Sequence, residues 1–266
     1  MIEQIIQPFR LIYSKRDLMR RSMIIEIKRK FAGSVIGFAW VFLGPLLLMG
    51  IYTIIYTVVF RMSPPGLAHY DYVILILSGL LSFLGFSDGL TSGTVSLSAN
   101  RELLLNTMFP AELLPLRSVL VSTTTTIVGM VVVLIMDSFV RHPSGFMLLV
   151  PIVLILQVMF TSGLVWVLSL ANLVVRDIQQ LLSYVVTILL IGSPIAYTPE
   201  MLPSSIKFMV YLNPLSYFVL TLQSLLLRDS LPDWKILAMV FFLGICVFLV
   251  GYRIFHKAKL AIFDYA

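Results

Sequence analysis

The chain has 266 residues, of which 59% are hydrophobic and 12% charged, and its mean hydropathy is +0.99. A soluble domain needs a mostly charged exterior, so this composition excludes one and predicts an all-α polytopic membrane protein. The formal charge of +6 does not indicate nucleic-acid binding, because the basic residues crowd the amino-terminal segment, as membrane topology predicts.

The amino-terminal segment, residues 1–35, is predicted to lie on the cytoplasmic membrane surface as amphipathic helices. Apolar residues recur at helical spacing over residues 1–13, where Pro8 should bend or restart the helix. Ser14 and Asp17 have the spacing of a capping box, so a second helix should begin near Lys15. A cleaved signal peptide is the alternative, but the next apolar run ends at Arg61 without a small-residue cleavage site.

Six apolar runs approach or exceed the ~20 residues that cross a bilayer. With both termini inside, most Lys and Arg residues fall on the cytoplasmic side, which predicts a multi-pass protein of the cytoplasmic (inner) membrane. A transmembrane domain over residues 36–256 and a cytoplasmic carboxyl terminus over 257–266 follow. The predicted spans are Ile36–Phe60, Tyr72–Leu97, Leu116–Val140, Phe146–Val174, Ile178–Tyr197 and Ile236–Phe255.

The second span carries Gly85, Gly89 and Gly93, a stripe that indicates close packing against another helix, with a flexible gate as the alternative. Asp88 on the same span requires a partner, because an ionised carboxylate facing lipid is unstable; a hydrogen bond to a neighbouring span is preferred over transport chemistry. Asp137 lies near the outer end of its span, where water should reach it.

A cytoplasmic connection, residues 98–115, follows the second span. It is charged at Arg101 and Glu102, then apolar, then broken at Pro110, which predicts a surface helix that docks a soluble partner. A tight interfacial turn is the alternative. Arg176 and Asp177 separate the fourth and fifth spans and should lie at a water interface.

The outer region, residues 198–234, is apolar but rich in proline, which no straight spanning helix tolerates. The run before it is expected to stop at Ser193-Pro194. Two short re-entrant helices, Ile206–Leu212 and Leu215–Leu227, should flank Asn213-Pro214, with Asn213 as the most exposed joint. The alternative, a true span over Leu215–Leu227, would put the basic carboxyl terminus outside.

A row of aromatic residues, Tyr52, Tyr56 and Phe60, follows one face of the first span. Such a row could stack on sugar rings along a pore, although aromatic residues at helical spacing more often serve in packing.

The remaining motifs run in order along nearly the whole chain, and their order and spacing are specific even though each alone is weak. On these residues the sequence resembles the ABC type-2 exporter permeases, in the branch that exports polysaccharide, O-antigen or teichoic acid. The motifs are Lys28-Arg29-Lys30-Phe31 with Ser34, Gly37, Trp40 and Pro45; Gly79-Leu80 with Phe83; Asn100, Leu104, Phe109-Pro110 and Pro115; Arg176-Asp177; Ser193-Pro194; Asn213-Pro214; and Phe255 before Phe263-Asp264-Tyr265.

The resemblance implies a half-transporter with six spans, an interface helix, a cytoplasmic coupling helix and two re-entrant helices. It implies a homodimer that works with two copies of a cytoplasmic ATPase subunit, which would hold ATP and Mg, in contact with membrane lipids. The chain itself has no G-x-x-x-x-G-K-[ST] phosphate loop, so we expect no catalytic residue, bound cofactor or metal site in it. No substrate-reading extension is expected beyond Tyr265.

The cargo implied by the resemblance is a lipid-linked glycan, and each candidate site residue has a role in its export. Basic side chains would meet a phosphate headgroup at the cytoplasmic entrance, since guanidinium and ammonium groups bind phosphate oxygens well. We assign ATPase coupling to Asp17, Arg20, Arg21, Asn100, Arg101 and Glu102, the entrance to Lys28, Arg29, Lys30 and Arg117, the glycan path to Tyr52, Tyr56 and Phe60, and the outer gate to Pro194, Asn213 and Pro214.

Three other functions remain open at the level of sequence. A type-2 exporter of drugs or lipids would share the architecture. An ion-coupled carrier would use Asp88 and Asp137 as proton or cation sites. An enzyme is the least supported, because His69, His142 and His256 are scattered and lack metal-ligand spacing.

Overall fold

The computed structural model describes residues 2–59, 68–106, 109–140 and 144–265, which fold almost entirely into helices. The elements, in chain order, are α1 (Ile2–Ser14), α2 (Arg16–Lys30), η1 (Gly37–Ala39), α3 (Trp40–Ile54), η2 (Ile55–Val59), α4 (His69–Thr94), α5 (Ser96–Ala99), α6 (Arg101–Asn106), α7 (Leu113–Val140), η3 (Gly145–Leu149), α8 (Val150–Val174), α9 (Ile178–Gly192), η4 (Pro199–Met201), α10 (Phe208–Leu212), α11 (Pro214–Leu227) and α12 (Trp234–Tyr265).

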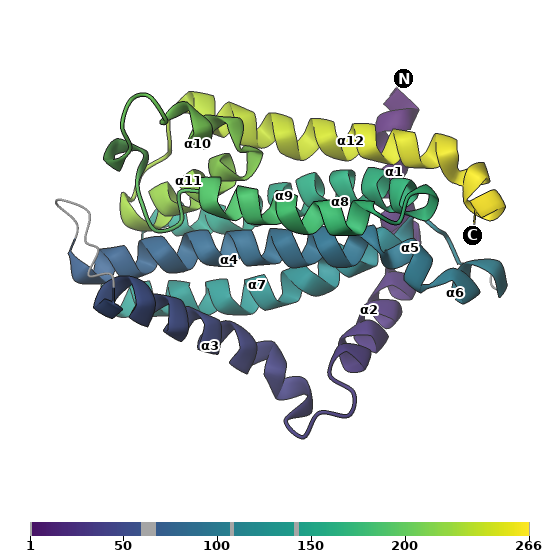
Figure 1. The fold of residues 1–266 in the computed structure, drawn as a ribbon, viewed down its shortest axis with the longest axis horizontal. Helices are drawn as coiled ribbons and strands as arrows, with labels where there is room; N and C mark the ends of the chain where they lie inside the picture. The colour runs from purple at the N-terminus through teal and green to yellow at the C-terminus, as the bar shows by residue number, and fades with distance from the viewer. Residues whose placement is uncertain (1, 60–67, 107–108, 141–143, 266) are drawn as a thin grey trace.

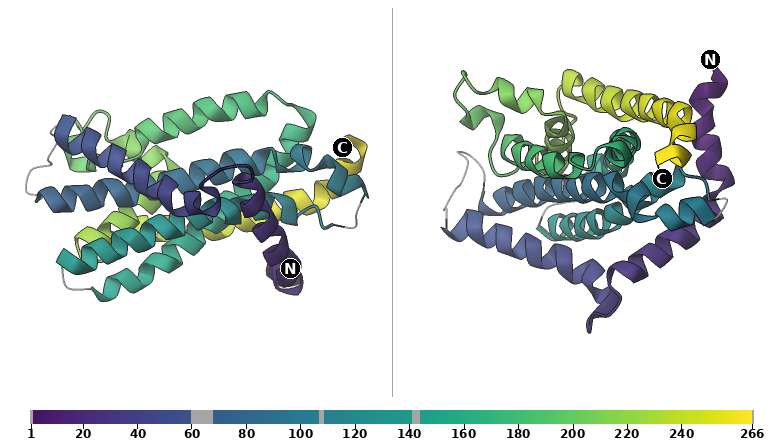
Figure 2. Two further views of the ribbon diagram at one scale, coloured as in Figure 1. Left: turned by 90° about the horizontal axis from the view of Figure 1, so that it is seen from below. Right: turned by 45° about the vertical axis from the view of Figure 1, so that its right-hand side comes forward.

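The long helices α4, α7, α8 and α12 run side by side along the length of the molecule (Figure 1). Both termini lie at one end of this bundle, together with α5 and α6, and α10 lies at the other end. Helices α2 and α3 form a V whose vertex projects away from the bundle (Figure 2). We call the two ends of the bundle the terminal end and the far end.

Five helical stretches of the described chain are long and apolar enough to cross a membrane: Gly37–Val59, His69–Thr94, Leu113–Val140, Gly145–Val174 and Trp234–Ala258. The predicted span Ile178–Tyr197 does not reach that length, because α9 has 15 residues and a rise of about 22 Å. Its helix stops at Gly192, immediately before the predicted break at Ser193-Pro194. The six-span count is therefore not confirmed by helix length.

Helix α4 forms the centre of the fold, and 78% of its most apolar stretch is buried. It packs against α7, α8 and α11. A reciprocal pair of hydrogen bonds joins it to α8: Gln157 Nε2 donates to the Ser82 carbonyl (2.7 Å), and Ser82 Oγ donates to Gln157 Oε1 (3.0 Å). These bonds fix the register of two helices that otherwise contact through apolar side chains.

Glycines allow the closest helix contacts, as the stripe on the second span predicts. A Cβ added at Gly85 would overlap the Thr126 side chain on α7, and one at Gly93 would overlap Val165 on α8. The contact between α8 and α12 is closer still, since a Cβ at Gly163 or Gly251 would meet backbone atoms of the facing helix. Gly163 and Gly251 belong to no local glycine stripe, so the sequence does not predict this contact.

Helix α1 contains Pro8 and continues through it without a restart, so of the two predicted effects of this proline only a bend is left. One local prediction is wrong in the amino-terminal segment. Ser14 does not cap α2; it still lies in the last turn of α1, where its hydroxyl donates to the Leu11 carbonyl (3.1 Å). The break between the helices falls at Lys15, as predicted.

The prediction that water reaches Asp137 is also wrong. Its side chain lies on the same face of α7 as Met130 and Val133, at i−7 and i−4, and that face packs inside the bundle. The exposed fraction of Asp137 is 0%.

Candidate functional site

At the far end, Asn213 joins α10 to α11 and is buried rather than exposed, which corrects the prediction for this joint. Its Nδ2 donates to the Leu189 carbonyl (3.0 Å) and to Ser193 Oγ (2.9 Å), while its Oδ1 accepts from the Leu215 amide (3.0 Å). Asn213 is thus the N-cap of α11, with Pro214 in the first helical position. The Asn213 side chain is buried because all three of its hydrogen-bond partners are protein groups: two backbone groups and the Ser193 hydroxyl.

The predicted gate residue Pro194 is buried beside this joint. Its carbonyl accepts a hydrogen bond from Gln223 Nε2 on α11 (2.8 Å), and the same nitrogen donates to the Leu75 carbonyl on α4 (3.3 Å). The break after α9, helix α11 and helix α4 are therefore held together by one amide. All three residues assigned to the outer gate come together here.

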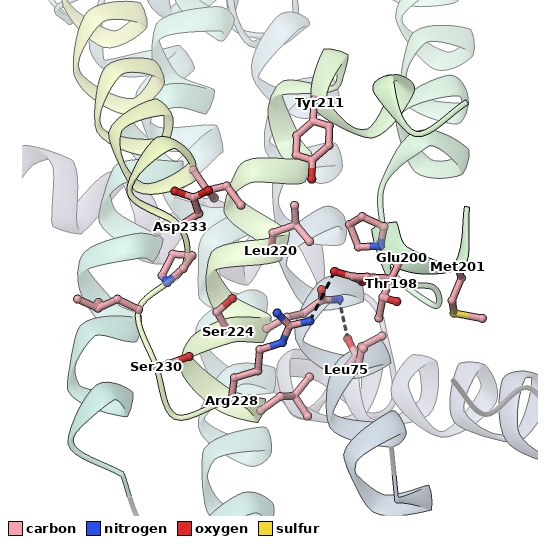
Figure 3. Close-up of a pocket in the computed structure, with 16 residues that line it drawn as sticks. Leu75, Thr198, Glu200, Met201, Tyr211, Leu220, Ser224, Arg228, Ser230 and Asp233 are labelled. Carbon is pink, nitrogen blue, oxygen red and sulfur yellow. Dashed lines mark hydrogen bonds and ion pairs between the residues drawn. The ribbon is translucent and has the colours of Figure 1, made fainter. Parts of the chain in front are cut away.

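A cavity of about 710 Å³ opens next to this group, between η4, α11 and the start of α12 (Figure 3). Arg228 on one side faces Glu200 on the other, with Nη2 and Oε1 3.9 Å apart. No sequence pattern predicts this cavity, because Glu200 and Arg228 are 28 positions apart, on either side of the two predicted re-entrant helices.

The structure describes two of the three residues of the aromatic row, which lie on α3 and η2. The rings of Tyr52 and Tyr56 stack with centroids 6.3 Å apart. Both pack against a buried cluster that contains Tyr72, Leu75 and Ile76 of α4. The packing interpretation therefore accounts for these two rings in the single chain; Phe60 lies outside the described residues.

At the terminal end, Arg117 connects three separate segments. It lies in the first turns of α7 with an exposed fraction of 5%. Its Nη2 is 3.1 Å from Glu26 Oε2 on α2 and donates to Asn100 Oδ1 (3.2 Å), in the turn between α5 and α6. We call Glu26, Asn100 and Arg117 the arginine cluster.

Local structure orients both side chains that bind Arg117. Asn100 donates its Nδ2 to the Ser96 carbonyl (2.8 Å), which fixes the amide so that its oxygen faces Arg117. Glu26 follows Met19 and Ser22 on α2, at i+7 and i+4, and those two residues form the buried stripe of that helix. A guanidinium this deeply buried requires such charge-assisted bonds, because an unpaired buried charge is strongly destabilising.

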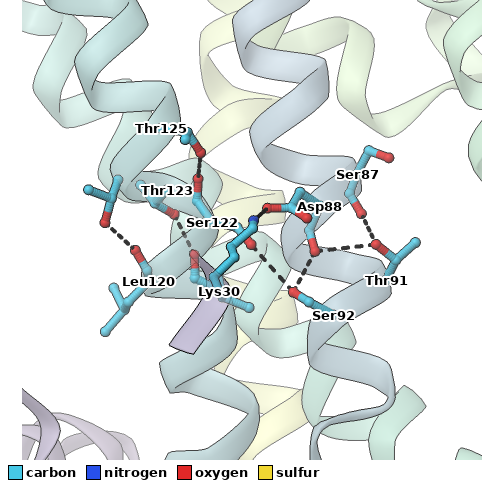
Figure 4. Close-up of polar contacts among 11 residues, drawn as sticks. Lys30, Ser87, Asp88, Thr91, Ser92, Leu120, Ser122, Thr123 and Thr125 are labelled. Atoms are coloured by element: carbon cyan, nitrogen blue, oxygen red, sulfur yellow. Dashed lines mark hydrogen bonds and ion pairs between the residues drawn. The ribbon is translucent and has the colours of Figure 1, made fainter. Parts of the chain in front are cut away.

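Lys30 ends α2 and forms an ion pair with Asp88 on α4, with Nζ and Oδ2 2.9 Å apart (Figure 4). Asp88 thus has a partner, as predicted, but the partner comes from α2 and not from a neighbouring span. Both side chains remain close to half exposed. One turn further along α4, Ser92 Oγ lies 3.3 Å from Ser122 Oγ on α7, so hydroxyl groups continue the polar surface between the two helices.

The other charged residues assigned to coupling and to the entrance do not join these contacts. They are exposed on α2 and α6 and form two charged surfaces at the terminal end: Asp17, Arg20, Arg21, Lys28 and Arg29 on α2, and Arg101 and Glu102 on α6. The residues assigned from the sequence therefore fall into two groups: the buried Arg117 and the half-buried Asn100 connect helices, and the charged residues of α2 and α6 are exposed.

The sequence does not predict a buried acid, Glu112, at the terminal end. The Glu112 side chain is 3% exposed, and its Oε1 lies 3.6 Å from Nδ1 of His256 on α12. His256 Nε2 is in turn 3.4 Å from Gln7 Nε2 on α1. No sequence pattern relates these three residues, which lie far apart in the chain.

Together, the five long apolar helices of the described chain define a multi-pass membrane protein with charged surfaces at one end. Residues 19–227 match the sequence profile described as ABC-2 type transporter. Because this match covers most of the 266 residues, the chain belongs to the ABC-2 type transporter family.

Curated relatives match over most of their length. The chain is 29% identical over 227 residues to the O-antigen export system permease protein RfbA of Myxococcus xanthus, covering 84% of this chain and 85% of that protein. It is 27% identical over 236 residues to a protein of the same name from Klebsiella pneumoniae, covering 88% of this chain and 89% of that protein.

Proposed function

We propose that this chain is the permease subunit of an ATP-driven exporter that moves a lipid-linked polysaccharide of O-antigen, capsule or teichoic-acid type across the cytoplasmic membrane. The observation that carries the proposal is the similarity to O-antigen export permeases along 84% and 88% of the chain, within a family of transporters. The structure supports the proposal with five long apolar helices, a buried polar joint at Asn213, and exposed charges on α2 and α6.

ATP and Mg would bind to a separate ATPase subunit, two copies of which would serve a permease homodimer. The exposed charges on α2 and α6 are the surfaces on which such a subunit would dock. Since Arg117 joins α2, α7 and the turn before α6, a push on either surface would reach the transmembrane helices through buried bonds. Lys30 and Asp88 provide a second, more exposed connection from α2 to α4.

The second permease copy would cover the helices that one chain leaves uncovered. Only 17% of the most apolar stretch around α3 is buried, and α9 exposes Leu181, Ile188 and Ile191 by 62%, 67% and 73%. These faces would contact either lipid or the partner copy. Glycan would pass between copies, with Tyr52 and Tyr56 available on α3 and η2, and the basic residues of α2 would meet the headgroup.

In the membrane, α9 and the stretch to Tyr197 would together complete a sixth crossing, so that both termini lie in the cytoplasm. Helices α10 and α11 would then form a re-entrant pair at the outer face. This arrangement is supported by Asn213, which lies beside the last turn of α9, and by Arg228 at the end of α11, which lies near Glu200.

Deletion of the gene in the source cell, followed by complementation, tests the proposal. We expect surface polysaccharide to disappear and lipid-linked glycan to accumulate inside, and both to recover with the intact chain. An unchanged surface polysaccharide in the deletion strain would contradict the proposed cargo. The ion-coupled alternative has little support, since Asp88 is paired with Lys30 and Asp137 is closed off from solvent.

A further inference from the structure

The far end contains two adjoining cavities that the proposed export path does not use. The first, of about 710 Å³, is the one that Glu200 and Arg228 face across. The second, of about 630 Å³, shares Tyr211, Asp233 and Ile236 with it. Both volumes fall within the ~300–1,000 Å³ typical of small-molecule sites. We call the two adjoining cavities together the groove; residues of α11, α12 and the loop between them line both.

Polar side chains surround the first cavity (Figure 3). Carboxylates, a guanidinium and hydroxyl groups line it, and the Tyr211 hydroxyl points down into it. Burial raises the pKa of Glu200, but hydrogen bonds from its own amide and from Thr198, with the positive charges of Arg228 and Lys207, hold it below its ordinary value. At neutral pH Glu200 is therefore a carboxylate that accepts hydrogen bonds.

The second cavity is aromatic. Tyr211, Tyr217, Trp234 and Phe242 line it, and the rings of Tyr211 and Tyr217 lie 6.4 Å apart. Trp234 is 72% exposed, so much of its ring is free to stack on a ligand. Broad rings with a polar edge suit a ligand that has an apolar face and many hydroxyl groups.

The charges select among ligands. Glu200 and Asp233 supply two carboxylates to the first cavity, and Arg228 supplies one guanidinium. Lys235 lines the second cavity, so the two acids are balanced by two cations and the groove has no net charge to hold a phosphate headgroup. Sugar hydroxyls can donate to the carboxylates and accept from the guanidinium. A sugar ring also presents an axial C–H face to the aromatic cavity.

We propose that this groove is a glycan subsite at the far end of the permease, in which sugar units of the exported chain bind hydroxyl to carboxylate in the first cavity and stack on aromatic rings in the second. The inference rests on the proposed function and adds a binding site whose lining does not include Tyr52 or Tyr56 of the aromatic row. The groove is lined by α11, α12 and η4, and α11 begins at the predicted gate residues Asn213 and Pro214, so a glycan bound here would contact the helix that follows the gate.

Cysteine protection in living cells tests the subsite. Ser224 lines the first cavity, and Ser205 is exposed at the same end without lining it. Each is changed to cysteine in a Cys246→Ala background, and labelling by a membrane-impermeant maleimide is timed from outside. Two strains are compared: one makes the glycan, and the other makes the lipid carrier but no polymer.

We expect the Ser224→Cys chain to label severalfold more slowly in the glycan-producing strain, and the Ser205→Cys chain to label equally in both. Adding Trp234→Ala to the Ser224→Cys chain should remove the protection, which a merely structural role of Trp234 would not do. Equal labelling of Ser224→Cys in both strains, slowing at both positions, or no labelling at all would each overturn the subsite. Surface polysaccharide measured in the same cells reports separately on the proposed function.

Discussion

Replacing Arg117 with methionine tests the arginine cluster, because methionine keeps much of the side-chain volume and removes the charge. The Arg117 side chain is 6% exposed and that of Glu26 is 31% exposed. An exposed ion pair contributes about 0.2–1 kcal/mol, and removing one partner of a fully buried pair costs about 3–5 kcal/mol. The pair lies between these limits, so we expect Arg117→Met to lower the free energy of unfolding by about 2 kcal/mol.

A double-mutant cycle separates the pair from other effects of the substitution. Arg117→Met, Glu26→Gln and the double variant are unfolded at equilibrium in mixed micelles and followed by circular dichroism. Groups in contact show interaction energies of about 0.5–3 kcal/mol, and we expect a value within that range. Arg117→Lys should be intermediate, because an ammonium group cannot reproduce the planar fork that reaches Glu26 and Asn100 together.

The same variants are then assayed for export. We expect Arg117→Met to reduce surface polysaccharide even at a temperature at which the variant remains folded. Effects of the two single substitutions that add within ~0.5 kcal/mol, or normal export by Arg117→Met, would refute the connection between α2 and α7.

Three further predictions concern packing, the far-end joint and pH. Gly163→Ala should cost about 1–3 kcal/mol, because its Cβ would meet the Val247 backbone, whereas Gly50→Ala, with open space around it, should leave thermal stability unchanged or higher. Asn213→Ala should destabilise the chain by about 0.5–2 kcal/mol through loss of the α11 cap, and a cysteine at 213 should resist labelling from either side. The depressed pKa of Glu200 contributes stability above its ordinary pKa that is lost as pH falls through the folded value, and Glu200→Gln should remove this part of the pH dependence of the melting temperature.

Specific results would contradict each of these. Equal melting temperatures for Gly163→Ala and Gly50→Ala would show that α8 and α12 are not in close contact. Rapid labelling at 213 in the folded chain would restore the exposed joint that the sequence predicts. A pH profile unchanged by Glu200→Gln would show that its carboxylate is not stabilised by Arg228 and Lys207.

The sequence predicts most of the helices and the positions of their breaks, because apolar run length and proline are local signals. Pro194 and Pro214 are placed correctly for this reason, and α11 begins at the predicted joint. The sequence does not predict correctly which polar residues are buried. Asn213 and Asp137 are buried because other helices cover them, and no pattern within their own segments reports that contact.

In the candidate site, too, local features are predicted from the sequence and long-range contacts are not. The basic residues of α2 and the charged α6 are visible as local composition, whereas the Arg117 bonds join positions 26, 100 and 117, and the Glu112 contact joins α12 to the turn before α7. The far-end cavity likewise depends on residues separated by dozens of positions. Such pairings follow from the tertiary fold, so a single sequence does not contain them as a motif.

The most direct test of the proposed function is transport by the purified permease and its partner ATPase in proteoliposomes, with the ATPase facing outward and lipid-linked glycan in the outer leaflet. Adding ATP and Mg should make a growing fraction of the glycan resistant to an external glycosidase, and an ATPase variant unable to hydrolyse ATP should abolish that protection. Glycan that stays fully digestible in the presence of ATP would contradict export of polysaccharide by this chain.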